Sequence, residues 1–403
     1  MRLLLCAFLM LALMLPAFAL AGDTHTLFVA TDPHFISPAL TDYGPFFISM
    51  IENGDGKLVH YSNELTDAFV QQVIEAKPDC LILSGDLTFN GAKKSHEDFS
   101  AKLRRIDESG IPVLVLPGNH DLYCYAAAQF AGDGYTLTER ITSEEFAAIY
   151  HDLGFDLALS RDPYSLSYIA EPIPGVRILM LDTNTLMLEG AVTQNTYTWL
   201  ESVLSAAQQD GAKVIAVSHQ NLYAHSGLLY EGFMIANASM LQSRYEKYGV
   251  AVNLSGHIHM QHMISGEGMV PEIATSSLAV SPCQYGAITL DGNQASYRTQ
   301  TVDVSAWANA NGKTDPNLLN FASYAKDFFL NTSLRQKPTG DPDADALAAW
   351  IAKVNAAYFA GRTDLIPPAP AAASITTDGF HSAYIASILA EPPRDHTHLD
   401  FPL

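Results

Sequence analysis

The amino-acid sequence predicts a layered α/β domain followed by a smaller, mainly helical domain. Short apolar runs alternate with amphipathic segments from residue 23 to about residue 302, a pattern typical of alternating strands and helices. Side chains of the kinds that bind metals follow directly after five of the apolar runs. Beyond residue 304 the strand pattern stops and helical spacing continues. A chain of 403 residues is also longer than an average single domain, which agrees with two.

The five apolar runs predict buried strands. They read TLFVA, CLILS, VLVLP, VIAVS and VAVNLS, and short apolar runs of this kind are typical of strands. Residues 63–76, 95–109 and 194–210 have the spacing of amphipathic helices and stand between strands. Because ligands of such domains gather at the carboxyl ends of the strands, we expect the polar residues after the five runs along one edge of a sheet.

Further segments complete the two predicted domains. Residues 122–175 form a long insertion with one helix at 143–151 and are expected to form part of a pocket wall, while residues 268–302 read as short strands that close the first domain. Further helices are expected at residues 317–330, 344–361 and 379–390. We place the large domain at residues 22–303 and a helical domain at residues 304–403, whose simplest role is a cap packed on the sheet.

The start of the chain has the features of a secretory signal peptide. Arg2 precedes an apolar stretch at residues 3–15, and the Ala-Leu-Ala at 19–21 offers a small-x-small cleavage site. The stretch is short for a membrane span and is followed directly by Pro16. We therefore expect a cleaved leader at residues 1–21 and a secreted or cell-envelope protein that keeps no membrane span.

Net charge and cysteine content narrow the classes of partner and site. The chain has 43 acidic and 22 basic residues and a formal net charge of −21, which argues against a nucleic-acid duplex or an anionic membrane as the main partner. A small anionic substrate can still bind where metal cations invert the local field. The three cysteines beyond the leader make no disulfide framework, although a Cys124–Cys283 bridge stays open. With no CxxC spacing, metals must be held by N and O ligands.

Seven metal-ligand side chains stand in the order that a two-metal site needs. They are Asp32, His34, Asp86, Asn119, His219, His257 and His259. Two ions a few ångströms apart can lower the pKa of a bridging water and stabilise the attacking and leaving oxygens together. One carboxylate must then bridge both ions, and Asp86 is the natural candidate because its strand lies between the others in the motif order. A lone His219 would more often be a core histidine, but the ordered set favours a ligand.

The motifs D-x-H, GD, GNHD, H and GHxH resemble those of the calcineurin-like metallophosphoesterases over most of residues 25–302. The GDLT-x-x-G, LDTN and GHIH forms resemble the cyclic-nucleotide phosphodiesterase branch of that family. The resemblance implies the metallophosphoesterase fold, a layered β-sandwich core flanked by helices. It implies that one ion is held by Asp32, His34, Asp86 and His259, and the other by Asp86, Asn119, His219 and His257. His120 would then protonate the leaving group, and Asp121 would orient the ring of His120.

Two positions depart from patterns found in relatives. Phe89 stands where purple acid phosphatases place an iron-binding tyrosine, so a tyrosinate-iron site is not expected. The two divalent ions can then be Mn, Fe or Zn, and the N and O ligand set does not choose among them. Gln220 follows His219 where relatives often carry His-Pro, and we expect it to alter the pocket rim without removing a ligand.

Several other histidines match parts of the ligand pattern. The Asp23-Thr24-His25 motif precedes the first strand instead of ending it and is expected at the surface. The HxH at residues 396–398 is expected in a mobile tail. His225 and His262 either line the pocket or belong to loops, and the sequence leaves both readings open.

The expected function is hydrolysis of small phosphodiesters, with cyclic nucleotides as the favoured substrates, by an exported enzyme. A metal-bridging hydroxide would attack phosphorus, and His120 would act as the general acid. No G-x-S-x-G nucleophile motif competes. The alternatives are a phosphomonoesterase, a lipid-headgroup phosphodiesterase of the sphingomyelinase-like branch, and a non-enzymatic surface interaction protein with structural metals. The oligomeric state stays open.

Overall fold

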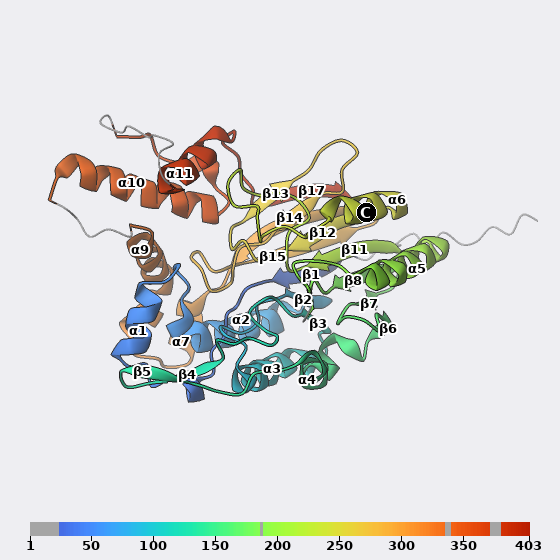
Figure 1. Ribbon diagram of the computed structural model, residues 1–403, viewed down its shortest axis with the longest axis horizontal. Helices are drawn as coiled ribbons and strands as arrows, with labels where there is room; N and C mark the ends of the chain where they lie inside the picture. Colours follow the sequence, from blue (N-terminus) through green and yellow to red (C-terminus); the bar gives the residue numbers. More distant parts are fainter. Residues whose placement is uncertain (1–23, 186–187, 335–339, 371–379) are drawn as a thin grey trace, which may run out of the picture.

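The computed structural model describes residues 24–185, 188–334, 340–370 and 380–403. Two large β-sheets are stacked, helices cover their outer faces, and a helical region lies at one end (Figure 1). The predicted fold class, a layered α/β sandwich flanked by helices, is confirmed. The leader predicted at residues 1–21 lies outside the described residues.

The first large sheet has six strands. Their spatial order is β17 (His398–Pro402), β16 (Gln294–Thr301), β15 (Gln284–Asp291), β1 (His25–Ala30), β2 (Cys80–Ser84) and β3 (Val113–Leu116). The strands β1, β2 and β3 run parallel, whereas β15 and β1 pair antiparallel. These three parallel strands contain the first three predicted apolar runs, except for Pro117 at the end of the third.

The second large sheet has seven strands. Their spatial order is β13 (His262–Ile264), β14 (Glu272–Ala274), β12 (Val250–Ser255), β11 (Lys213–Ser218), β8 (Val176–Leu181), β7 (Tyr168–Ile173) and β6 (Ala158–Arg161). The parallel strands β11 and β12 contain the last two predicted runs. The insertion at residues 122–175 supplies β6 and β7, so part of it extends this sheet.

The largest apolar core lies between the two sheets, and the alternating residues of β8 show how it forms. Val176, Ile178 and Met180 join this core, whereas Leu179 and Leu181 join a second core beneath the helices. Successive side chains of a strand face opposite sides of its sheet, and both sides are covered here. This double burial explains why the strand reads as a continuous apolar run.

Helices cover the outer face of each sheet (Figure 1). The seven-stranded sheet is covered by α5 (Gln194–Asp210) and α6 (Ala238–Tyr248), and the six-stranded sheet by α2 (Ser62–Ala76), α3 (Lys93–Asp107) and α7 (Val304–Ala310). Helix α5 has the bounds that its sequence predicts. It starts at Thr193, whose hydroxyl accepts from the amide of Thr196, and ends at Gly211, which has a φ of 70°.

Shorter elements complete the part of the chain before residue 304. They are the turn η1 (Pro38–Leu40), α1 (Pro45–Glu52), the turn η2 (Val59–Tyr61), the hairpin of β4 (Ala128–Ala131) and β5 (Gly134–Leu137), α4 (Ser143–Ile149), the turn η3 (His151–Phe155), and the pair β9 (Asn184–Thr185) and β10 (Leu188–Glu189). The hairpin and α4 belong to the insertion, and the hairpin lies beside α1 (Figure 1).

The C-terminal region is helical, as predicted. It comprises α8 (Pro316–Leu319), α9 (Phe321–Leu334), α10 (Pro342–Phe359) and α11 (Phe380–Ala390). Trp350 and Tyr358 of α10 share an apolar cluster with Ile385 of α11 and with Ile258 and Met260. Since these last two residues follow β12, the helices pack directly against the loop at the end of that strand.

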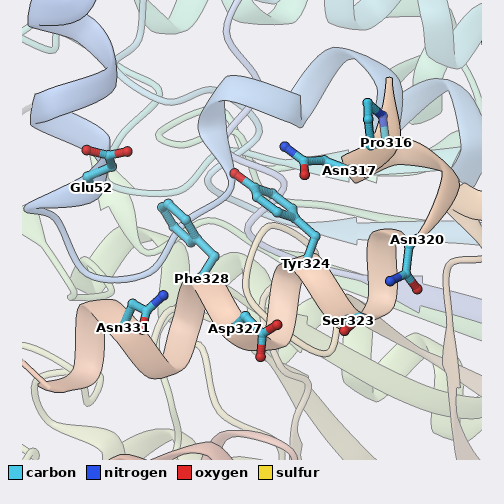
Figure 2. Close-up of a pocket in the computed structure, with 9 residues that line it drawn as sticks. All are labelled: Glu52, Pro316, Asn317, Asn320, Ser323, Tyr324, Asp327, Phe328 and Asn331. Carbon is cyan, nitrogen blue, oxygen red and sulfur yellow. The ribbon is translucent and has the colours of Figure 1, made fainter. Parts of the chain in front are cut away.

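Helix α9 also contacts the N-terminal part of the chain. A cleft lies between α9 and the end of α1, with Tyr324 and Phe328 on one side and Glu52 on the other (Figure 2). The hydroxyl of Tyr324 is 2.6 Å from the Nε2 of His60, which belongs to η2. Helix α9 is therefore tied to the segment that leads from α1 into α2.

The expectation of a mobile C-terminal tail is wrong. Strand β17 pairs antiparallel with β16 along its whole length, and it covers backbone groups that would otherwise be left unpaired at the sheet edge. The side chain of His396 is buried, and its backbone amide donates to the carbonyl of Gly361 over 2.7 Å. The chain thus returns from the helical region to the sandwich.

Cys80, Cys124 and Cys283 are free thiols, so the possible bridge between the last two is absent from the described residues. No helix in the described part of the chain has both the length and the apolar character needed to cross a membrane.

Candidate metal centre

The predicted ligands lie where strands of both sheets end. Asp32, Asp86 and Asn119 follow β1, β2 and β3 of one sheet, whereas His219 and His257 follow β11 and β12 of the other. The ligands therefore line the rim of the sandwich, and the expectation that they share one edge of a single sheet is wrong. Strands of the two sheets have the same apolar signature because both are buried on two faces.

Five of the predicted ligands have left-handed backbones. They are Asp32, His34, Asp86, His257 and His259, with φ angles of 50°, 43°, 49°, 67° and 63°. This conformation is uncommon outside glycine, and Asp, Asn and His tolerate it best. The amides of Asp32 and His34 donate to the carbonyls of Gly85 and Asp86, each over 3.1 Å. The turn after β1 is thereby held against the turn after β2.

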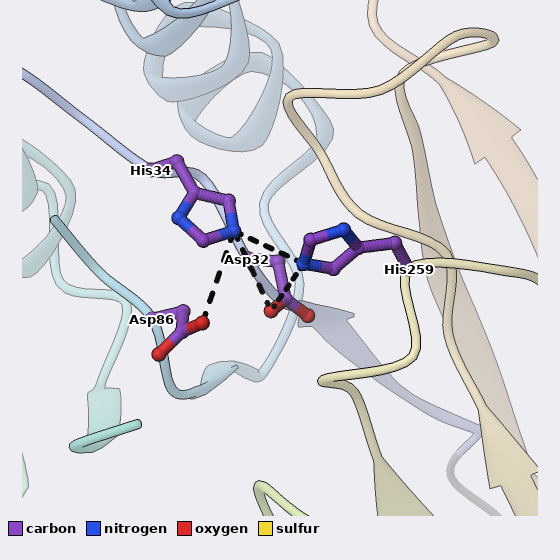
Figure 3. A group of neighbouring side chains, drawn as sticks. All are labelled: Asp32, His34, Asp86 and His259. Carbon is purple, nitrogen blue, oxygen red and sulfur yellow. Dashed lines mark hydrogen bonds and ion pairs between the residues drawn. The ribbon is translucent and has the colours of Figure 1, made fainter. Parts of the chain in front are cut away.

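Asp32, His34, Asp86 and His259 form a first cluster, in which the side chains converge (Figure 3). The Nε2 atoms of His34 and His259 are 3.1 Å apart, and Asp32 Oδ1 lies 3.3 Å from His259 Nε2. Asp86 Oδ2 lies 3.8 Å from His34 Nε2. Asp32 Oδ1 is buried and has no hydrogen-bond partner among the described residues. A bound cation would relieve the cost of that orphaned oxygen.

Asp86, His219 and His257 form a second cluster. His219 Nε2 lies 3.3 Å from Asp86 Oδ1 and 3.1 Å from the amide oxygen of Asn119. Asp86 therefore belongs to both clusters, with Oδ2 toward the first and Oδ1 toward the second. Gly118 leaves no room for a side chain beside it, because a Cβ there would collide with the Asp86 carboxylate.

Backbone carbonyls determine which ring nitrogens face the second cluster. The Nδ1 of His219 donates to the carbonyl of Ser84, and the Nε2 of His257 donates to that of Gly232, each over 2.9 Å. The other nitrogen of each ring faces the cluster and offers a metal its lone pair when the ring is neutral. Imidazole, carboxylate and amide oxygen donors together fit divalent ions such as Mn, Fe or Zn.

Carboxylates and imidazoles of the centre lie close together and shift one another's pKa. Burial favours a neutral Asp86, but the imidazoles of His219 and His120 hold the pKa of its carboxyl well below the usual range. Burial would likewise lower the pKa of His219, yet the carboxylates of Asp86 and Asp32 raise it to about 9. Burial, followed by the neighbouring His219, lowers the pKa of His257 to about 4. A cation bound here would therefore displace a proton from His219 and meet a neutral His257.

His120 lies beside the two clusters without belonging to either. Its Nδ1 donates to the carbonyl of Phe89 over 3.0 Å, and its Nε2 lies 3.9 Å from Asp86 Oδ2. Its side chain is 36% exposed, so the Nε2 edge can meet a molecule that enters from solvent. The ring of His34 is next to it, with centroids 5.1 Å apart.

Asp121 does not orient His120 as expected, because its carboxylate binds backbone amides. It accepts from the amides of Leu87 and Thr88 over 3.0 Å and 2.9 Å and from that of Gly118 over 2.8 Å. Burial and the charge of Asp86 raise the pKa of the Asp121 carboxyl to about 7. The amides of Leu87 and Thr88 lie in the sharp turn after Asp86, and that of Gly118 follows β3. These three amides are outside the strands and need a buried acceptor. The carbonyl of Phe89, and not the carboxylate of Asp121, accepts the hydrogen bond from the His120 ring.

Gln220 lies below the site and not at its rim. Its side chain is buried, and its amide Nε2 donates to the Oδ1 of Asn184 over 2.7 Å while its Oε1 accepts from the Nδ2 of Asn184 over 3.1 Å. The hydroxyl of Thr183 also donates to Gln220 Oε1. Gln220 therefore ties the LDTN turn to the strand end that carries His219. The sequence signals for this network were the LDTN motif and the Gln that follows His219.

The remaining histidines lie away from the two clusters. His225 and His262 are buried neighbours, with their Nδ1 atoms 2.9 Å apart. The Nε2 of His225 is 2.9 Å from a carboxylate oxygen of Glu272. His25 lies outside the site, and its Nδ1 is 3.0 Å from the carboxylate of Asp79. These contacts assign His225 and His262 to the packing between β13, β14 and the helical region.

Models of two protein families match parts of the chain. The model of the calcineurin-like phosphoesterase family matches residues 17–261, and that of the C-terminal domain of cyclic nucleotide phosphodiesterase matches residues 303–395. No curated protein matches the chain.

Solved structures also match the chain, each at low sequence identity. A dimetal phosphatase from Danio rerio is 13% identical, with a TM-score of 0.48 over 69% of this chain and 96% of that one. A purple acid phosphatase from yellow lupin (Lupinus luteus) seeds is 16% identical, with a TM-score of 0.47 over 70% of this chain and 52% of that one. The Plasmodium protein GAP50, an anchor in the inner membrane complex, is 14% identical, with a TM-score of 0.42 over 69% and 85%. Because the family model covers more than half of its residues, the chain belongs to the calcineurin-like phosphoesterase family.

Proposed function

We propose that the protein is a two-metal phosphodiesterase that acts on cyclic nucleotides or similar small diesters. The observation that carries the proposal is the position of Asp86, whose two oxygens face two separate clusters of ligands. A dinuclear centre needs a carboxylate placed in this way. The match of residues 303–395 to the C-terminal domain of cyclic nucleotide phosphodiesterase supports diesters over other phosphate esters.

Each predicted ligand has a role in this proposal. The first ion would be held by Asp32, His34, Asp86 and His259, and the second by Asp86, Asn119, His219 and His257. The ions, when bound, supply an activated water and neutralise charge on the phosphoryl oxygens. Mn, Fe and Zn all suit these donors. Phe89 contributes only its backbone carbonyl, and its ring packs with Phe130.

His120 would act as the general acid. Its Nδ1–H is already engaged by the Phe89 carbonyl, so in the imidazolium form the transferable proton sits on Nε2, the atom that faces the site. During hydrolysis the attacking water would give up one proton to solvent as its oxygen bonds to phosphorus, the bond from phosphorus to the leaving oxygen would break, and the Nε2 proton would pass to that oxygen. His120 would then regain a proton from solvent. Asp121 would hold the two loops that carry Asp86 and His120.

Substrate class is tested on metal-reconstituted protein with bis-aryl and mono-aryl phosphates. We expect faster turnover of the diester, and monoesterase turnover that equals or exceeds it would favour a phosphomonoesterase instead. A second panel compares 2′,3′- and 3′,5′-cyclic nucleotides with mononucleotides, glycerophosphodiesters and sphingomyelin. Preference for sphingomyelin would favour the lipid-headgroup alternative.

The acid role of His120 is tested in the same assays. We expect His120→Ala to lower kcat by about a hundredfold or more while leaving bound metal unchanged. His398→Ala is the matched control, because this exposed histidine pairs with Asp400 on the edge strand. Unchanged turnover in His120→Ala would refute the acid role of His120, whereas absence of turnover in the metal-loaded wild type as well would favour the non-enzymatic alternative.

Export is a separate part of the proposal. A leader at residues 1–21 would be removed to give a secreted or cell-envelope protein. Mass measurement of the protein recovered outside the cytoplasm, expected to begin at residue 22, tests this directly.

A further inference from the structure

A fully buried carboxylate, that of Glu272, belongs to none of the ligand motifs. Glu272 is the first residue of β14, the strand beside β12, and its side chain is fully buried. A glutamate is almost never buried to this extent unless its charge is paired. Burial alone would raise the pKa of its carboxyl, but the imidazole of His225 and several hydrogen bonds hold that pKa below its usual value. The carboxylate therefore keeps its charge, and its hydrogen bonds show which segments it holds.

Three partners of this carboxylate lie in the loop after β11, the strand that ends just before His219. Oε1 accepts from the amide of Leu222 over 2.7 Å, and Oε2 accepts from that of Tyr223 over 2.8 Å. The Nε2 of His225, in the same loop, lies 2.9 Å from Oε2. Glu272 thus anchors the loop that begins with one predicted ligand of the second ion.

The other two partners lie in β12, the strand that ends before His257. The Nδ2 of Asn253 donates to Oε1 over 2.9 Å, and the hydroxyl of Ser255 donates to the same oxygen over 2.8 Å. The two strand ends are also joined directly, because the amide of Gly256 donates to the carbonyl of His219 over 3.1 Å. The carboxylate therefore binds both strand ends that carry the histidines of the second cluster.

The ligands of the first ion are held by other contacts. Ser277 donates from its hydroxyl to the carbonyl of Asp32 over 2.8 Å and from its amide to that of His259 over 3.1 Å. The amide of His34 donates to the carbonyl of Asp86 over 3.1 Å. Loss of the Glu272 carboxylate should therefore affect the second ion more than the first.

Glutamine cannot replace this glutamate, although the two side chains have the same shape. Each oxygen of Glu272 faces a backbone N–H, that of Leu222 at Oε1 and that of Tyr223 at Oε2. A backbone N–H can only donate, so either orientation of a glutamine amide would place its NH2 against a donor. One buried donor would then lose its acceptor. Glu272→Gln should therefore displace the loop after β11 from the end of β12.

We propose that Glu272 is a positioning residue of the second metal site, whose carboxylate fixes the ends of β11 and β12 so that His219 and His257 face one ion. Glu272 acts through the backbone and is not itself a ligand. The inference rests on the two-metal centre of the proposed function and adds to it a residue that lies outside every ligand motif.

The test measures the affinity of each ion separately. His259→Ala leaves only the ligand set of the second ion complete, and His257→Ala leaves only that of the first. Glu272→Gln is added to each of these variants, and metal-free protein is titrated with Mn or Zn. We expect the second ion to bind about ten- to a hundredfold more weakly, the range for residues that orient metal ligands. The first ion should change by less than about threefold, because its ligands share no partner with Glu272.

Asp162→Asn is the matched control for loss of a buried carboxylate. Asp162 is also buried, but it follows β6 at the far edge of the same sheet. Its carboxylate accepts from the amide of Tyr164 over 3.2 Å and from the hydroxyl of Thr196 over 2.7 Å. We expect Asp162→Asn to lower stability in denaturant titrations and to leave both metal affinities within about threefold of wild type.

Glu272→Asp tests whether the charge is what matters. It keeps the carboxylate on a shorter side chain and should recover part of the affinity that glutamine loses. If Glu272→Gln does not fold, Glu272→Asp takes its place, with a smaller loss that is confined to the second ion.

Unchanged affinity for the second ion in Glu272→Gln would overturn the inference. Equal weakening of both ions would do the same, as would an equal loss in Asp162→Asn. Metal binding is measured without turnover, so a wild type that binds two ions but cleaves no diester would refute the proposed function alone. A wild type that binds a single ion would overturn the two-metal centre and this inference together.

Discussion

Replacement of Asp86 by Asn should remove both metal ions, whereas loss of a ligand from one cluster should remove one. Asp86 is shared by a cluster of four side chains and a cluster of three. His259 belongs only to the first and His257 only to the second. Asp86→Asn keeps the shape of the side chain but removes the charge that faces both clusters.

The expected magnitude follows from the position of the carboxylate. Loss of an outer contact to a metal ligand costs about 10- to 100-fold in metal affinity, so loss of the charged ligand itself should cost at least about 100-fold for each ion. This corresponds to about 3 kcal/mol per ion.

Elemental analysis after dialysis against a fixed free concentration of Mn or Zn measures the effect. We expect about two ions per chain in wild type, about one in His259→Ala and in His257→Ala, and far fewer than one in Asp86→Asn. A single ion retained by Asp86→Asn would refute the bridging role. Loss of both ions from His259→Ala would contradict the division into two clusters.

Two other predictions concern the site and its support. Gly118→Ala should lower metal content without touching a ligand atom, because its Cβ would collide with the Asp86 carboxylate, and elemental analysis that finds the wild-type content would contradict this. Burial lowers the pKa of His60 from 6.5 to about 4, so the fold disfavours the protonated ring and loses stability as pH falls through that interval. This loss amounts to about 3 kcal/mol near pH 4. Denaturant titrations of His60→Phe should show a correspondingly smaller decline, and superimposable pH profiles would disprove the assignment.

Much of the site could be predicted because ligands follow strands. The run CLILS predicts β2 with its observed bounds, and the Asp that follows it lies at the centre of the site. The sequence could not assign strands to sheets. All five residues of β2 are buried, as are all six of β12 in the other sheet. A strand that is buried on both faces has no alternation of apolar and polar residues. Its sequence therefore does not indicate to which of the two sheets it belongs.

The role of Asp121 could not be predicted from the sequence. Two residues that are neighbours in a tight turn can point their side chains in different directions. Asp121 follows His120, and a carboxylate next to a catalytic imidazole suggested contact. The structure instead leaves three backbone amides near Asp121: two follow the left-handed turn at Asp86, and the third, of Gly118, follows β3. Backbone donors of this kind are not visible in a sequence.

The prediction of a mobile tail at the C-terminus was wrong for a related reason. The segment HLDFP is short and follows a proline-containing stretch, so local pattern favours a tail. Its partner, β16, is about a hundred residues away along the chain, and the pairing from Gln294 to Arg298 makes it a strand. Long-range pairing decides such edge segments, and local propensity is too weak a guide.

The two sheets are joined at the site itself, which links formation of the site to formation of the sandwich. The amide of His257, after β12, donates to Asp32 Oδ2 across the rim over 2.9 Å. The ring of His219, after β11, donates to the carbonyl of Ser84 in β2 over 2.9 Å. Left-handed turns at Asp32 and His257 cost of order 1 kcal/mol each and persist because these contacts hold them. Ligand geometry is therefore a consequence of sheet stacking, so a variant that loosens the stack should lose metal before it loses either sheet.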